Sequence, residues 1–396
     1  MNSSLLTKLN ILFIGLNIIL FIGFILKYTS VLPFFQRKYN INTTERKKLN
    51  SIKWVDATQL EIIGQLSNCK KFSRLPLEAK NNVAPYVWEI SQNSSGISIL
   101  FESNTSSINL KWLSNKRSKH HNMTLIAAKG FDLYSFIDNK WQFVNSVIPS
   151  ENLFNLKTII NKMDKENRLY MLNLPLYDIV NSIEIGIDKN AIIEKPRSKI
   201  INRTNPVVFY GTSITQVASA SRPGLTYVSL LERYYNHEFI NLGFSGNGKF
   251  EKSVAVHFIK KNPAMVFLDC TPNSPDSIIK KNLPELIDYI HSINKNTPIV
   301  LIESIYYDNS YLISKNDSSA SSQNYISKQN KALRKVFLEK KELHQNLYYI
   351  NESELIGSDH EATIDGIHFN DIGHFRAYEN LRVILNTIQE RTGIKL

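Results

Sequence analysis

Five residues of the sequence form a pattern that acyl-transfer chemistry requires. They are Ser213 in "VVFYGTS", Gly246 in "NLGFSGNG", Asn273 in "AMVFLDCTPN", and Asp365 and His368 in "IDGIH". The first three each follow an apolar stretch, and the last two precede the last amphipathic stretch. A serine hydroxyl is a poor nucleophile until a base removes its proton. An imidazole titrates near neutral pH and can be that base. The pattern therefore favours a serine nucleophile activated by a histidine.

The other three residues fit supporting roles in the same chemistry. Asp365 precedes His368 by three residues and can hold the imidazole in one tautomer, as the third member of a catalytic triad does. The tetrahedral intermediate needs donors for its oxyanion, and the candidates are the backbone N–H groups of Ser213 and Gly246 and the amide of Asn273.

Each residue also has an ordinary structural alternative. Ser213 could be the N-cap of a helix that follows the apolar stretch, and Asn273 could be a turn residue. His360 is a rival to His368 for the role of base. The joint occurrence of these residues in this order, after separate apolar stretches, favours the catalytic interpretation.

The second half of the chain, residues 201–396, has the pattern of a parallel α/β sheet. Apolar stretches at residues 207–210, 264–270 and 298–304 alternate with stretches of helical periodicity, and a last helix is expected from about Asn370. This alternation predicts a three-layer α/β/α domain with helices on both faces of the sheet. Ligands bind at the carboxyl ends of the strands in such sheets, so the candidate residues should meet at one edge.

The first half predicts an antiparallel β-sandwich over residues 51–200. "SINLKW" and "SIEIGID" alternate apolar and polar residues with a period of two, which is typical of half-buried strands. "GISILFES" and "YVWEIS" (residues 86–91) are further expected strands. Short strands separated by Asn, Ser and Gly are typical of a sandwich.

The sequence resembles the SGNH, or GDSL-like, hydrolases in the blocks "GTSIT", "GFSGNG", "DCTPN" and "DGIHFND". This resemblance implies a flavodoxin-like hydrolase domain that needs no cofactor and no metal. It also implies roles for particular residues: Ser213 as nucleophile, Gly246 and Asn273 as oxyanion donors, and Asp365 and His368 as the rest of the triad.

The resemblance extends to a subgroup with a jelly-roll-like β-sandwich domain before the hydrolase domain, through "SRLP", "GFDLY" and "NLPLYD". Members of this subgroup are typically exported bacterial proteins treated as carbohydrate esterases. The sequence departs from the expected patterns at several positions, two of which lie next to or near Ser213. Thr212 stands where the superfamily has the Asp of Gly-Asp-Ser, and Val217 stands where a glycine is expected after "TSITQ".

Residues 9–26 contain no charged residue and are long enough to span a bilayer as a helix. A cleaved signal peptide is the alternative. Residues 27–50 are then a linker. The basic residues that follow the apolar segment favour a cytoplasmic hydrolase domain. The resemblance to exported proteins favours a periplasmic or extracellular hydrolase domain. We therefore expect a membrane-anchored protein with its hydrolase domain in the periplasm or outside the cell.

The net charge of +12 is spread along the chain without a dense basic run, so no nucleic-acid partner is expected. We expect a serine esterase that hydrolyses a small acyl ester, with acetyl favoured, on a carbohydrate or a related small molecule. Two alternatives stay open. An O-acyltransferase acting on a cell-envelope glycan would use the same residues, and a glycan-binding protein would use none of them for catalysis.

Overall fold

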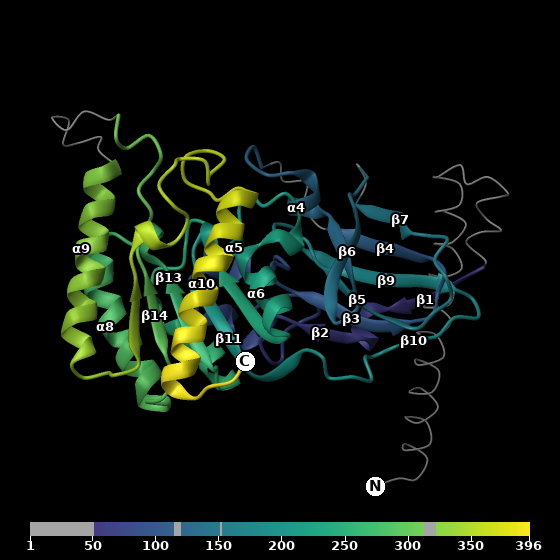
Figure 1. Ribbon diagram of the computed structural model, residues 1–396, viewed down its shortest axis with the longest axis horizontal. Helices are drawn as coiled ribbons and strands as arrows, with labels where there is room; N and C mark the ends of the chain where they lie inside the picture. Colours follow the sequence, from purple (N-terminus) through teal and green to yellow (C-terminus); the bar gives the residue numbers. More distant parts are fainter. Residues whose placement is uncertain (1–50, 115–119, 151–152, 313–321) are drawn as a thin grey trace, which may run out of the picture. The chain divides into compact units, whose positions relative to one another are not determined.

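The computed structural model describes residues 51–114, 120–150, 153–312 and 322–396 (Figure 1). The expected membrane segment at residues 9–26 and the linker at residues 27–50 lie outside the described residues. Among the residues that are described, no helix is both long and apolar enough to cross a membrane.

The N-terminal region contains two β-sheets, as the period-two patterns predicted. One sheet has the strand order β1-β9-β4-β7, and the other has the order β10-β3-β8-β5-β6 with β2 paired to β3. Neighbours of β3, β4 and β5 in these sheets pair antiparallel. The strands are β1 (Ile52–Asp56), β2 (Glu61–Ile63), β3 (Ser98–Ser103), β4 (Ile108–Ser114), β5 (Phe131–Ile137), β6 (Lys140–Val147), β7 (Phe154–Ile160), β8 (Arg168–Asn173), β9 (Val180–Asp188) and β10 (Ile193–Glu194).

Apolar side chains from both sheets meet in one buried cluster. Ile108, Leu110 and Trp112, alternate residues of β4, are buried there with Phe131 of β5. The rings of Trp112 and Phe131 pack edge to face with centroids 5.0 Å apart. The alternation of apolar and polar residues therefore predicted the buried face of β4 correctly.

The expected strand at residues 86–91 is wrong, because this segment is helix α3 (Pro85–Ser91). Pro85 occupies the first turn, where its missing N–H is not needed. The buried residues of α3 are Val87 and Ser91, four positions apart, which is helical spacing. Val87 joins the apolar cluster of the C-terminal sheet rather than that of the sandwich. A short apolar stretch alone did not distinguish the two structures.

The C-terminal domain contains a parallel sheet with the strand order β12-β11-β13-β14-β15. This is the flavodoxin-like order. The chain adds β12 on one side of β11 and then adds β13, β14 and β15 on the other side. The strands are β11 (Asn202–Gly211), β12 (His237–Gly243), β13 (Met265–Asp269), β14 (Ile299–Ile302) and β15 (Leu347–Ile350).

Helices cover both faces of this sheet, as predicted (Figure 1). Val208 and Tyr210 of β11 are buried in a cluster with α7, α8 and α9, whereas Val207 and Phe209 are buried in a cluster with α6 and α10. The helices are α5 (Ser213–Gln216), α6 (Tyr227–Tyr235), α7 (Lys252–Phe258), α8 (Asp276–Ile293), α9 (Ser322–Lys341) and α10 (Asp371–Thr392), and α4 (Leu125–Lys129) belongs to the N-terminal region.

Candidate active site

Ser213 is the first residue of α5, directly after β11. The preceding residue, Thr212, is the N-cap of α5, and its hydroxyl accepts a hydrogen bond from the N–H of Ile214. Gly211 fits a tight turn here, because a Cβ at this position would lie 2.1 Å from Thr215 Oγ1. The capping role is therefore filled by Thr212, and the hydroxyl of Ser213 contacts another residue.

Ser213, His368 and Asp365 form a continuous series of polar contacts. Ser213 Oγ lies 3.0 Å from His368 Nε2, and His368 Nδ1 lies 2.7 Å from Asp365 Oδ2. The His368 and Asp365 side chains are 20% and 33% exposed. The structure thus brings together three of the five residues that the sequence indicated, at the contact distances of a proton-transfer chain.

The backbone around Asp365 fixes its carboxylate. Asp365 Oδ1 accepts hydrogen bonds from the N–H groups of Ile367 at 3.1 Å and His368 at 2.8 Å. Partial burial raises the pKa of Asp365, but hydrogen bonds from the backbone and ring of His368 outweigh this effect, so the pKa lies below its ordinary value. Asp365 is therefore ionised and oriented toward the imidazole at neutral pH.

Gly246 lies in the loop after β12, next to the turn that carries Ser213. Its φ of 69° lies in the left-handed region, and a Cβ built on it meets no atom within 4 Å. Gln216 anchors this loop, because its Oε1 accepts from the N–H of Ser245 at 2.9 Å. Gly248 of the same loop approaches the Gly211 carbonyl so closely that a Cβ would lie 2.1 Å from that oxygen. The Cβ position of residue 246 is therefore open space, in a loop that contacts the turn carrying Ser213.

Asn273 ends a short 3-10 helix (Thr271–Asn273) after β13. One N–H of its amide donates to the carbonyl oxygen of Asn247 at 2.6 Å, which joins the loops after β12 and β13. An asparagine amide has two N–H donors, and the contact with Asn247 uses one of them. Gln329 of α9 supports the turn by donating to the Thr271 carbonyl at 2.8 Å.

A buried polar chain lies beneath the turn that carries Ser213. Thr215 Oγ1 donates to Asp269 Oδ2 at 2.7 Å and lies 3.2 Å from the hydroxyl of Tyr227. Burial raises the pKa of Asp269 to about 7, although the hydrogen bond from Thr215 lowers it. This chain ties α5 to the end of β13 and to α6.

Val217, which stands where the family resemblance leads us to expect a glycine, adopts a left-handed backbone conformation that suits glycine. It ends α5 with φ 74° and ψ 65°, in the left-handed region, and its side chain is fully buried beside Ala127, Leu176 and Tyr177. A β-branched residue in this region is strained. Burial of the isopropyl group against the N-terminal region offsets that strain.

His360 does not contact Ser213. Its Nδ1 lies 3.0 Å from Asp308 Oδ1, and its side chain is 54% exposed. His368 is therefore the histidine that faces the serine. In the described ranges, no group of three or more His, Cys, Asp or Glu side chains has the geometry of a metal site.

Asn122 is a polar neighbour of Asp365 and His368 that sequence reasoning missed. Its Nδ2 lies 3.0 Å from Asp365 Oδ2 and 3.3 Å from His368 Nδ1. Asn122 comes from the loop before α4, 243 positions from Asp365 along the chain. No local spacing could have predicted a contact between such distant segments.

Comparison with protein families assigns both halves of the chain. Residues 204–386 match the GDSL-like lipase/acylhydrolase family, and residues 52–193 match the GxDLY family, described as the N-terminus of SGNH-hydrolase-type esterases. The chain belongs to the GDSL-like, or SGNH, hydrolases and is an enzyme that acts on ester bonds. A comparison with curated proteins finds no match.

Solved structures with a similar fold cover most of the chain. A structure from Bacteroides ovatus described as a GDSL-like lipase is 33% identical, covers 86% of this chain and 98% of its own, and superposes with a TM-score of 0.79. A salicylyl-acyltransferase from a tetracycline biosynthetic pathway is 16% identical, with coverage of 85% and 98% and a TM-score of 0.68. An acetyl xylan esterase from Butyrivibrio proteoclasticus is 10% identical, with coverage of 86% and 99% and a TM-score of 0.53.

Proposed function

We propose that the protein is a serine esterase with Ser213 as nucleophile, His368 as general base and Asp365 as the residue that orients the base. The observation that carries this proposal is the contact series of 3.0 Å from Ser213 Oγ to His368 Nε2 and 2.7 Å from His368 Nδ1 to Asp365 Oδ2. In such a series the imidazole accepts the hydroxyl proton, and the carboxylate stabilises the resulting imidazolium.

The reaction proceeds in two acyl-transfer steps. Ser213 Oγ attacks the acyl carbon while its proton moves to His368 Nε2, and the carbonyl oxygen becomes an oxyanion. The ester C–O bond then breaks, and the departing oxygen takes the proton from His368. Water attacks the acyl-enzyme as His368 again accepts a proton, and the protonated imidazole returns that proton to Ser213 Oγ as the acid leaves.

The proposed oxyanion donors are the N–H groups of Ser213 and Gly246 and the second amide N–H of Asn273. Support comes from the open space at Gly246 and from the anchoring of Asn273 on the Asn247 carbonyl. Fixed donors of this kind act without reorganisation when charge develops on the oxygen.

The proposed substrate is a small acyl ester, with acetyl favoured, on a carbohydrate or a related molecule. The family membership supports an acyl ester, and the fold shared with an acetyl xylan esterase agrees with a carbohydrate ester. A second candidate is O-acyl transfer to a glycan, because the fold is also shared with a salicylyl-acyltransferase. The same residues would form the same acyl-enzyme, and only the acceptor would differ.

The test is turnover of p-nitrophenyl esters of two, four and eight carbons by the full-length chain and by its Ser213→Ala and His368→Ala variants. We expect the two-carbon ester to react fastest and both variants to be nearly inactive. Equal slow rates for all three proteins would contradict the triad and favour a glycan-binding role. Faster release with an added oligosaccharide, together with acylation of that sugar, would favour the acyltransferase.

The cellular location is a separate proposal, namely a membrane-anchored protein with a periplasmic or extracellular hydrolase domain. Protease added to cells whose outer layer is permeabilised, with the cytoplasmic membrane intact, should then degrade the domain. Protection of the domain in these cells, with degradation only after the cytoplasmic membrane is broken, would contradict this location.

A further inference from the structure

The N-terminal region supplies a side chain to the triad. Asn122 Nδ2 lies 3.0 Å from the same carboxylate oxygen, Asp365 Oδ2, that His368 Nδ1 contacts at 2.7 Å. The other oxygen of Asp365 is held by two backbone N–H groups from its own turn. The carboxylate thus has donors on both oxygens, and among the described residues the donor from outside the turn at residues 365–368 is Asn122.

The amide of Asn122 acts on the orientation and charge of the carboxylate. His368 Nδ1 and the Asn122 amide both lie at Oδ2, so Asn122 gives this oxygen a donor that does not depend on the position of the imidazole. The Asn122 hydrogen bond is also one of the interactions that lower the pKa of Asp365 against the effect of burial. Both effects keep an ionised carboxylate aligned with His368 Nδ1.

The loop that carries Asn122 is attached to the hydrolase domain two residues later. Thr124 caps α4 by accepting from the N–H of Ala127 at 3.0 Å, and its hydroxyl donates to the carbonyl oxygen of Ser221 at 2.6 Å. The N–H of Ser221 in turn donates to Asp371 Oδ1 in the first turn of α10, at 2.8 Å. The position of Asn122 is therefore tied to the helix that follows the His368 turn.

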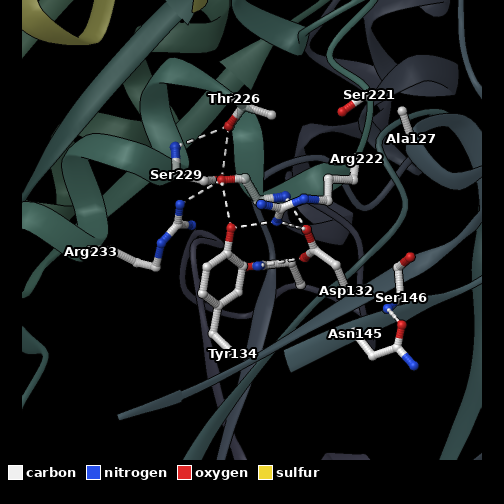
Figure 2. Close-up of polar contacts among 12 residues, drawn as sticks. Ala127, Asp132, Tyr134, Asn145, Ser146, Ser221, Arg222, Thr226, Ser229 and Arg233 are labelled. Carbon is white, nitrogen blue, oxygen red and sulfur yellow. Dashed lines mark hydrogen bonds and ion pairs between the residues drawn. The ribbon is translucent and has the colours of Figure 1, made fainter. Parts of the chain in front are cut away.

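The segment at Ser221 is itself held by the sandwich, as Figure 2 shows. Arg222 donates to Asp132 Oδ2 at 2.8 Å, and the N–H of Gly224 donates to the same oxygen at 2.8 Å. Asp132 is fully buried, and its other oxygen accepts from the amide of Asn173 at 2.7 Å. The "GFDLY" strand β5 thus holds the segment to which the Asn122 loop is attached.

We propose that Asn122 is a positioning residue for the triad, so that the N-terminal region completes the active site of the hydrolase domain. This inference rests on the proposed serine esterase mechanism. In this proposal the N-terminal region contributes directly to the rate of the reaction, in addition to packing on the hydrolase domain.

The experiment measures labelling of the full-length chain by a fluorophosphonate. Ser213 Oγ attacks phosphorus, the P–F bond breaks to release fluoride, and the serine proton passes to His368. The rate therefore reports the nucleophile and base without any recognition of a sugar. It is measured for wild type, Asn122→Ala, Asn122→Asp, Ser213→Ala and Asn145→Ala, with p-nitrophenyl acetate kinetics and thermal unfolding alongside.

Asn145→Ala is the matched control. Asn145 lies on β6, and its amide donates to the Ile159 carbonyl at 2.8 Å while its oxygen accepts from the N–H of Ser146. The control thus loses similar hydrogen bonds from the same region without contact to the triad. Asn122→Asp keeps the size of the side chain but replaces its donor with a negative charge beside Asp365.

We expect Asn122→Ala to lower the labelling rate and kcat about tenfold, the usual scale of a hydrogen bond to a charged group, with KM unchanged. Asn122→Asp should lose more, and Asn145→Ala should label at the wild-type rate. Labelling of both Asn122 variants at the wild-type rate, or an equal loss in Asn145→Ala, would overturn this inference while leaving the triad intact. Absence of labelling in wild type would instead overturn the proposed function.

Discussion

Thr212 caps helix α5 and Ser213 contacts His368, whereas the sequence alone left open which of these Ser213 does. A serine after a strand is commonly a helix cap. Here the hydroxyl of Thr212 accepts from the N–H of Ile214, and Ser213 Oγ lies 3.0 Å from His368 Nε2. The departure from Gly-Asp-Ser at Thr212 therefore retains a capping side chain, because threonine and aspartate both accept at this position.

Val217 gives a prediction about stability at the scale of one residue. Its φ of 74° strains any residue with a Cβ, by roughly 1–2 kcal/mol. Val217→Ala keeps most of that strain and loses buried apolar surface, so it should be less stable than wild type. Val217→Gly should be more stable than Val217→Ala by about 1 kcal/mol, measured by urea unfolding. The reverse order, which is usual at ordinary helical positions, would contradict the strained conformation.

Asn122, the residue missed by sequence reasoning, makes its contact with Asp365 across the two halves of the chain. The blocks containing Ser213, Gly246 and Asn273 follow the adjacent strands β11, β12 and β13, so their position at one edge of the sheet was predictable. Asn122 approaches Asp365 only because the N-terminal region packs on the hydrolase domain. The spacing of residues within either half contains no information about that packing.

At the scale of elements, the two kinds of sheet were predictable from periodicity, whereas α3 was not. The alternating residues of β4 are typical of a strand that is buried on one face. The continuous apolar stretch of β13 is typical of a strand that is buried on both faces. The segment Pro85–Ser91 is too short for periodicity alone to separate helix from strand. Its helical form follows from tertiary packing of Val87 on the C-terminal core.

The contact between β5 and the segment before α6 gives a prediction at this scale. Arg222→Met leaves the fully buried carboxylate of Asp132 without its cation, which should lower the free energy of unfolding by about 3 kcal/mol. Adding Asp132→Asn removes the unpaired charge and should recover part of that loss. Additive effects of the two substitutions in urea unfolding would show that the pair is not coupled.

At the scale of the whole molecule, stability should depend on the pH through Glu232 of α6. Burial raises the pKa of this carboxyl to about 8 from its ordinary value of 4.5, although the backbone N–H of Phe239 donates to it. Between these pH values the folded state binds more protons than the unfolded state. The contribution of Glu232 to stability therefore falls as the pH rises through this interval.

Glu232→Gln keeps an oxygen acceptor for Phe239 but does not ionise. Relative to wild type, the variant should become more stable as the pH rises from 4.5 to 8, at up to about 1.4 kcal/mol for each unit of the pKa shift. Denaturant unfolding of both proteins across this range measures the difference. A difference that stays constant with pH would contradict the raised pKa of Glu232.

The identity of the nucleophile is the central claim, and covalent modification tests it most directly. The full-length chain is treated with a fluorophosphonate at neutral pH, digested, and mapped by tandem mass spectrometry. The account predicts one adduct, on the Oγ of Ser213, that is lost in Ser213→Ala and strongly reduced in His368→Ala. An adduct on another residue, or labelling that persists in Ser213→Ala, would contradict it.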